Sequence, residues 1–293
     1  MAWDLPDTIS IRDVGPRDGL QPEQPVRVAD RVALITALVD AGVTDVEAAA
    51  FVSPRAVPAM AGAGDLFRAL ERDEHVRYWA LVPNVKGAEL AVEAGVDGLT
   101  VTVSASETYS QKNVKMSVAE SVAQIGSIAD VAGSRPVDVV ISCAFGSYDA
   151  AEDIGAFDVA AIVDSAQDAG ASRITLADTT GVATPDRIAD VVATTGVDVR
   201  LHLHDTRGTA LVNAFAAMTL GVSAFDTAVG GLGGSPFAEG AGGNLATEDL
   251  VHLCDGLGID TGIDLDKMIR TAGTVSALIG RAVPSRITAT LGR

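Results

Sequence analysis

The stretch Val199-Arg200-Leu201-His202-Leu203-His204-Asp205 places two histidines two residues apart among aliphatic side chains. In a β-strand, side chains at positions i and i+2 point to the same face, so both imidazoles converge on one point. Imidazole pairs suit divalent metals, whereas an isolated histidine is more often a satisfied residue of the core. The chain has only four histidines, and the residues at the other strand ends decide between the two interpretations.

This stretch is one of eight short β-branched runs that alternate with longer segments of helical period. The predicted strands lie near Thr8–Val14, Asp45–Phe51, Val76–Val82, Gly98–Ser104, Val137–Ala144, Arg173–Asp178, Val199–Asp205 and Ala224–Gly230. Helices are predicted between most of them, among others at Val28–Ala41, Val159–Ala169, Pro185–Thr195 and Ala210–Leu220. Such alternation gives parallel strands with crossover helices, and eight units predict a closed α/β fold, the TIM (β/α)₈ barrel.

The alternative fold is an open, doubly wound sheet. No Gly-x-Gly-x-x-Gly motif follows the first predicted strand, which disfavours a dinucleotide-binding fold. After the eighth strand, from about residue 245 to residue 293, we expect extra C-terminal helices that cover the barrel. Residues 1–293 would then form a single catalytic domain.

The 293 residues carry a formal net charge of −18, which argues against nucleic acid and anionic membrane surfaces as partners. No apolar run reaches membrane-spanning length, and the N-terminus lacks a signal segment. The two cysteines do not make a disulfide framework. These features predict a cytoplasmic protein.

Polar residues follow several predicted strands, at the end of the barrel where chemistry is expected. The first strand leads into Gly15-Pro16-Arg17-Asp18-Gly19-Leu20-Gln21, which offers a carboxylate and a cation or simply a turn with a solvated ion pair. Glu47 lies in an otherwise apolar strand and needs a partner, for which Arg17 is a candidate. Asp178 ends the sixth strand, either as a turn or cap residue or facing the barrel mouth.

The eighth strand continues into a glycine-rich loop. Seven of the fifteen residues from Gly230 to Asn244 are glycine, so the loop either moves or brings backbone N–H groups to a ligand, unless it is a plain connector. Asn244 offers a neutral oxygen ligand. One carboxylate, two imidazoles and one amide oxygen suit Mg²⁺ or Mn²⁺, with Zn²⁺ less favoured.

Several of these segments resemble 3-hydroxy-3-methylglutaryl-CoA (HMG-CoA) lyase, of the DRE-TIM metallolyase superfamily. The resemblance runs from about Ile9 to about Lys267, and the run Gly-Asn-Leu-Ala-Thr-Glu-Asp at Gly243–Asp249 is its most specific part. It implies a TIM barrel with Mg²⁺ or Mn²⁺ bound to four residues: Asp18, His202, His204 and Asn244. It also implies an acyl-CoA substrate and a role in leucine degradation. A homodimer is a further expectation, without a sharp signal in the sequence.

The implied reaction is retro-Claisen cleavage of HMG-CoA to acetoacetate and acetyl-CoA. The C3 hydroxyl loses a proton, the C2–C3 bond breaks, and negative charge builds on the thioester oxygen, where Arg17 is a fixed positive charge. His202 is the predicted base, because imidazole titrates near neutral pH. Glu47 and Asp178 would hold Arg17 and the region of the substrate hydroxyl. Residues predicted to contact the substrate or the phosphates of CoA are Gln21, Lys86, Lys112 and Lys115.

The sequence departs from the family at Ser235, where the glycine loop of the family reads Gly-Gly-Leu-Gly-Gly-Cys-Pro and the cysteine handles the proton of the enolate. A hydroxyl is a far weaker acid than a thiol, whose pKa is roughly 8.5. Either another group or water protonates the enolate, or the substrate is a related branched 3-hydroxyacyl-CoA. Two further hypotheses are a condensing enzyme, for which no segment is long enough to form an extra regulatory domain, and a barrel that binds acyl-CoA with little turnover.

Overall fold

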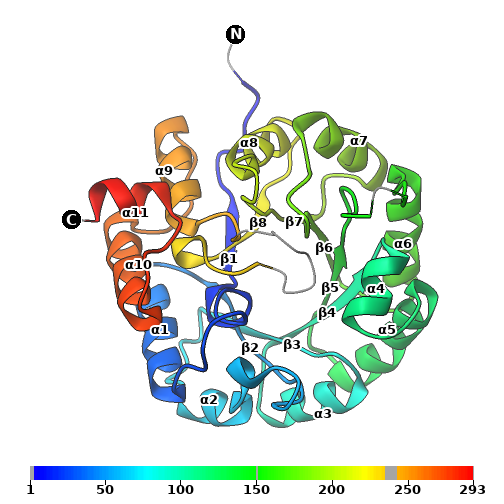
Figure 1. Cartoon of the computed structure of the whole chain (residues 1–293), viewed down its shortest axis with the longest axis horizontal. Helices are drawn as coiled ribbons and strands as arrows, with labels where there is room; N and C mark the ends of the chain where they lie inside the picture. The colour runs from blue at the N-terminus through cyan, green and yellow to red at the C-terminus, as the bar shows by residue number, and fades with distance from the viewer. Residues whose placement is uncertain (1–2, 150, 235–242, 293) are drawn as a thin grey trace.

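The structure, a computed structural model, describes residues 3–149, 151–234 and 243–292, and its eight parallel strands close into a barrel (Figure 1). Each strand pairs with the next along the chain, and β8 pairs with β1. The strands are β1 (Ser10–Asp13), β2 (Asp45–Ala50), β3 (Arg77–Leu81), β4 (Gly98–Ser104), β5 (Val137–Ser142), β6 (Arg173–Ala177), β7 (Arg200–His202) and β8 (Ala224–Thr227). The predicted TIM barrel is confirmed, and the open doubly wound sheet is wrong.

Helices form the outer ring of the barrel (Figure 1). They are α1 (Val28–Asp40), α2 (Ala63–Ala69), α3 (Val85–Glu93), α4 (Glu107–Asn113), α5 (Val118–Ala132), α6 (Ala156–Asp168), α7 (Pro185–Thr195) and α8 (Ala210–Thr219). The expected C-terminal helices are α9 (Thr247–Leu257), α10 (Leu265–Ile279) and α11 (Arg286–Leu291), which gather beside β8 and α1 (Figure 1). That residues 1–293 make one catalytic domain stays a prediction. Among the described helices, none combines the length and the apolar character that crossing a membrane requires.

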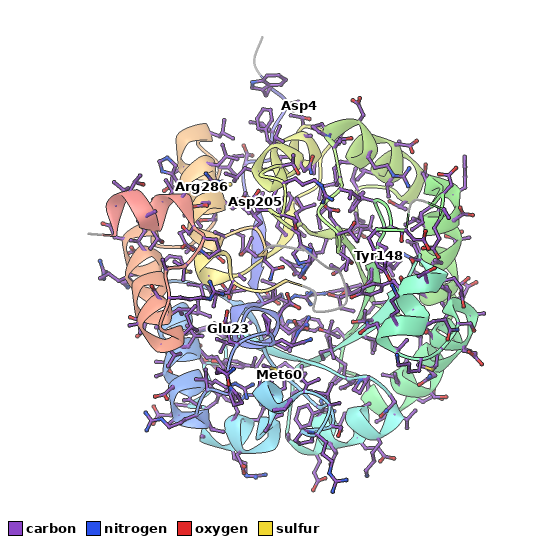
Figure 2. All side chains as sticks on the ribbon, in the orientation of Figure 1. Asp4, Glu23, Met60, Tyr148, Asp205 and Arg286 are labelled. Carbon is purple, nitrogen blue, oxygen red and sulfur yellow. The ribbon has the colours of Figure 1, made fainter. Side chains whose placement is uncertain are left out.

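Side chains fill the inside of the barrel (Figure 2), and part of this filling is charged. The fully buried guanidinium of Arg12, on β1, lies 2.6 Å from the carboxylate of Asp138 on β5 and 2.8 Å from that of Asp226 on β8. A buried charge is tolerated when opposite charges and hydrogen bonds surround it. This ionic layer forms the floor beneath the polar residues at the strand ends.

Candidate active site

A cavity of about 560 Å³ opens at the carboxyl ends of the strands. Its lining includes the predicted site residues Arg17, Asp18, Gln21, His202 and His204. The rest of the lining includes smaller or apolar side chains, such as Val52, Leu81, Val140, Ala177 and Thr179. Among the described residues that line the cavity, Arg17 is the one lysine or arginine.

Arg17 and Asp18 are presented by a tight turn, the π-helix η1 (Gly15–Gly19), directly after β1. A side chain at Gly15 would not fit, because its Cβ would lie 2.8 Å from Oδ1 of Asp13. Arg17 Nη1 donates to Asp18 Oδ1 at 2.7 Å, and Arg17 Nε donates to Glu47 Oε2 at 2.6 Å. The predicted pairing of Arg17 with Glu47 is thus confirmed.

The neighbouring carboxylates keep Arg17 in its charged form. Burial by itself lowers the pKa of Arg17, but the carboxylates of Glu47 and Asp18 outweigh this effect and raise it above the ordinary value. The guanidinium therefore presents a fixed cation to the cavity, as a site for developing negative charge requires.

The two histidines meet Asp18, as predicted. One ligand atom from each of Asp18, His202 and His204 lies within 4.8 Å of the others. The Nδ1 atom of His202 lies 3.3 Å from Oδ2 of Asp226, and Nδ1 of His204 lies 2.8 Å from the carbonyl oxygen of Asp178. Such contacts fix the orientation of a ring and leave its Nε2 for a metal.

Two buried atoms at this point have no hydrogen-bond partner among the residues that the structure describes, namely Nε2 of His204 and Oδ1 of Asn244. Buried polar atoms in folded proteins are almost always satisfied, so these two call for a ligand. The amide nitrogen of Asn244 donates to Asp18 Oδ2 and to the carbonyl of Leu232, both at 2.8 Å, and this holds the amide oxygen in place. The donor set fits a divalent cation better than it fits a pair of satisfied core histidines.

Metal binding needs a carboxylate and neutral imidazoles, and the protonation states of Asp18 and His204 meet this need. At His202, burial acts to lower the pKa, but Asp226 and Asp18 outweigh it and raise the pKa, so a metal has to displace a proton from this ring. Burial acts to raise the pKa of Asp18, but Arg17 and the two histidines lower it below the ordinary value. Burial, together with the nearby His202, lowers the pKa of His204 to about 4. Asp18 is therefore ionised and His204 neutral at neutral pH.

One carboxylate oxygen of Asp178 accepts hydrogen bonds from the turn after β6, and the other has no hydrogen-bond partner among the described residues. Its Oδ1 accepts hydrogen bonds from the backbone nitrogens of Val182 at 2.9 Å and Ala183 at 3.2 Å. Its Oδ2 is buried without a hydrogen-bond partner in the described part of the chain, and burial raises its pKa to about 6. The expected role in the turn is thus confirmed. The described lining of the cavity includes Ala177 and Thr179 but not Asp178, so the role at the barrel mouth stays a prediction.

The three lysines do not reach the lining of the cavity in this structure. Lys86 Nζ lies 3.0 Å from Glu89, Lys112 Nζ lies 4.4 Å from the ring centre of Tyr148 (labelled in Figure 2), and Lys115 donates to the carbonyl of Lys112. Their neighbours Asn84, Asn113 and Met116 do line the cavity, so the lysines stand close to its rim. Ser235 lies outside the described residues.

The sequence analysis missed Asp226, the buried carboxylate that contacts both His202 and Arg12. The signal that singled out Glu47, an acidic residue inside an apolar strand, is present at Asp226 as well. What the sequence lacked was any indication that β7 and β8 place this carboxylate beside an imidazole.

A family model described as HMGL-like matches residues 8–275 of the chain. The 3-hydroxy-3-isohexenylglutaryl-CoA/hydroxymethylglutaryl-CoA lyase of Pseudomonas aeruginosa is 40% identical over 291 residues, which cover 96% of either protein. The (R)-citramalyl-CoA lyase of Chloroflexus aurantiacus is 41% identical, over 96% of this chain and 94% of its own. The mitochondrial hydroxymethylglutaryl-CoA lyase of Homo sapiens is 38% identical, over 97% of this chain and 89% of its own.

Among solved structures, HMG-CoA lyases are similar to this chain along nearly its whole length. The HMG-CoA lyase of Bacillus subtilis superposes with a TM-score of 0.94 at 34% identity, and the match covers 100% of both chains. An HMG-CoA lyase from Acinetobacter baumannii in complex with coenzyme A and 3-methylmalate superposes with a TM-score of 0.92 at 38% identity, over 98% of this chain and 96% of its own. With a family model over residues 8–275 and such relatives along nearly its whole length, the chain belongs to the HMGL-like family.

Proposed function

We propose that this protein is a metal-dependent lyase that cleaves the C2–C3 bond of a 3-hydroxyacyl-CoA, with HMG-CoA as the principal substrate. The observation that carries the proposal is the meeting of Asp18, His202 and His204 beside Arg17, at the mouth of a cavity of about 560 Å³. The names of the relatives support the reaction class, and the coenzyme A in the Acinetobacter structure supports an acyl-CoA substrate.

The proposed metal ligands are Asp18, His202, His204 and Asn244, with Mg²⁺ or Mn²⁺ preferred over Zn²⁺ because oxygen and nitrogen donors are mixed. When bound there, a divalent cation supplies Lewis-acid chemistry and orients the hydroxyacyl group. Arg17 then faces the thioester oxygen as it takes on enolate charge, and Glu47 holds the guanidinium in that position.

A group on the protein has to accept the proton of the C3 hydroxyl. His202 remains the predicted base, but its Nδ1 contacts Asp226, and Nε2 would be taken up by the metal. Asp178 is a second candidate, because one of its oxygens lacks a hydrogen-bond partner among the described residues and burial raises its pKa to about 6. A carboxylate with a raised pKa is a stronger base than an ordinary one.

The 41% identity to a citramalyl-CoA lyase favours one second candidate substrate, a related branched 3-hydroxyacyl-CoA. A third candidate function, a barrel that binds acyl-CoA with little turnover, rests on Ser235 alone. A homodimer and a cytoplasmic location stay predictions.

The test is an assay of acetyl-CoA release from a panel of 3-hydroxyacyl-CoAs, with Mg²⁺, with Mn²⁺ and with a chelator. We expect metal-dependent release from HMG-CoA, faster in Ser235→Cys than in the wild type. Faster release from citramalyl-CoA than from HMG-CoA would assign the second substrate. No release from any substrate, in either protein, would favour the binding protein.

A further inference from the structure

The motif Gly243–Asp249 contains three polar residues that the proposed chemistry does not use, Thr247, Glu248 and Asp249. All three are buried at the start of α9. Asp249 accepts hydrogen bonds from the backbone nitrogens of Arg286, labelled in Figure 2, and of Ile287, so it caps α11. Thr247 donates to Asp13 Oδ2 at 2.7 Å. Glu248 makes the contacts that lead back to the candidate metal site.

Glu248 is a fully buried carboxylate that joins two segments far apart in the sequence. Its Oε2 accepts from the backbone nitrogen of Gly230 at 3.0 Å, in the first turn after β8. Its Oε1 accepts from the hydroxyl of Thr288 on α11 at 2.8 Å. One side chain thus ties the beginning of the glycine-rich loop to the C-terminal helix.

The segment before α11 packs on the same turn. The backbone nitrogen of Ser285 donates to the carbonyl oxygen of Gly230 at 3.1 Å. Gly230 has a φ of +70°, and a Cβ at this position would lie 2.8 Å from Cγ1 of Val283. Only glycine fits here without strain, so the turn after β8 is confined on both sides.

The same turn bonds one of the proposed metal ligands, Asn244, and lies against another, Asp18. The carbonyl of Leu232 accepts from the backbone nitrogen of Asn244 at 3.2 Å and from its side-chain nitrogen at 2.8 Å. A Cβ on Gly233 would lie 2.4 Å from Asn244 Nδ2 and 3.1 Å from Asp18 Oδ2, so the backbone lies directly against both ligands. A shift of this turn would therefore act on Asn244, and through its side-chain nitrogen on Asp18.

We propose that Glu248 is a positioning residue for the metal site, which it controls through Gly230, Leu232 and Asn244 rather than by touching the ion. The inference rests on the proposed function, because it takes the four ligands to be those named above. Hydrogen-bond reach, not charge, is the property of Glu248 that matters, since its partners are a backbone N–H and a hydroxyl.

The test measures Mn²⁺ affinity of metal-free protein, from the EPR signal of free Mn²⁺, together with the thermal midpoint Tm. Glu248→Ala should weaken Mn²⁺ binding about tenfold, as the loss of an outer contact to a metal site does. Glu248→Gln should bind like the wild type, because its amide oxygen still accepts from Gly230. Glu248→Asp should bind as weakly as Glu248→Ala, because its carboxylate is one methylene too short.

The matched control is Thr288→Val, which removes a hydroxyl partner of Glu248 and leaves Gly230 bonded. It should lower Tm without changing Mn²⁺ affinity. The inference would be overturned if the wild type and Glu248→Asp bound Mn²⁺ with equal affinity. It would also be overturned if Thr288→Val lost as much Mn²⁺ affinity as Glu248→Asp. If Glu248→Ala does not fold, the Gln and Asp variants decide alone. A wild type that binds no Mn²⁺ would instead refute the metal site itself.

Discussion

Replacing Asp226 with asparagine should weaken metal binding about 10- to 100-fold, which corresponds to about 1.4–2.7 kcal/mol. The carboxylate bonds Arg12 through both oxygens, at 2.9 and 2.8 Å, and one of these oxygens also lies 3.3 Å from His202 Nδ1. Asparagine has one oxygen, which the buried guanidinium of Arg12 takes. Its NH₂ group then faces His202 Nδ1 and favours the tautomer that carries its proton on Nε2, the nitrogen proposed to bind the metal.

The matched control is Asp138→Asn. Asp138 lies 2.6 Å from the same guanidinium and accepts from Thr175, but it makes no described contact with His202. Both variants should lower the free energy of unfolding in urea by about 1–3 kcal/mol, the usual cost of impairing a buried charged hydrogen bond. Only Asp226→Asn should weaken Mn²⁺ binding in a titration of metal-free protein. Equal Mn²⁺ affinities of the two variants would refute a specific role of Asp226 in orienting His202.

Three further predictions follow from contacts around the site. Burial raises the pKa of Asp13 to about 7, so its folded state holds a proton that the unfolded chain has lost. The free energy of unfolding should therefore fall by at most about 4 kcal/mol as the pH rises from about 4 to about 7. Urea titrations at several pH values measure this fall, and Asp13→Asn should remove most of it. Glu47→Gln should lower kcat by up to about 100-fold with little change in KM, because it loosens the guanidinium that opposes the enolate; an unchanged kcat would refute this role. Charge reversal of Lys86, Lys112 and Lys115 together should raise KM for the acyl-CoA and leave kcat alone, and unchanged kinetics would separate these lysines from CoA binding.

The strands and most of the site could be predicted because both depend on local spacing. All eight predicted strands exist, although some are shorter, as with Val199–Asp205, of which β7 keeps Arg200–His202. The chain leaves the sheet after His202, and His204 instead forms an isolated bridge with Asn244. The two imidazoles nevertheless converge as expected, because ligand atoms of both rings and of Asp18 lie within 4.8 Å of one another.

The contacts that could not be predicted join residues far apart in the sequence. Periodicity indicates that Asp226 points into the barrel but not that His202 and Arg12 meet it there. Likewise the run Thr247-Glu248-Asp249 identifies the family, yet nothing in its spacing reveals that Glu248 bonds Gly230 and Thr288. Such partners follow from the closure of the barrel and the return of the C-terminal helix, which only the assembled chain defines.

We expect metal binding and proton delivery to the enolate to depend on different residues. Asp18, His202 and Asn244 are fixed by strand ends and buried hydrogen bonds. In the sequence, Ser235 follows Gly234, which lines the cavity. A thiol there should raise turnover and leave Mn²⁺ affinity as it is, because acidity at the loop and geometry at the strand ends are set by different residues. A change in Mn²⁺ affinity in Ser235→Cys would show that loop and metal site act as one unit.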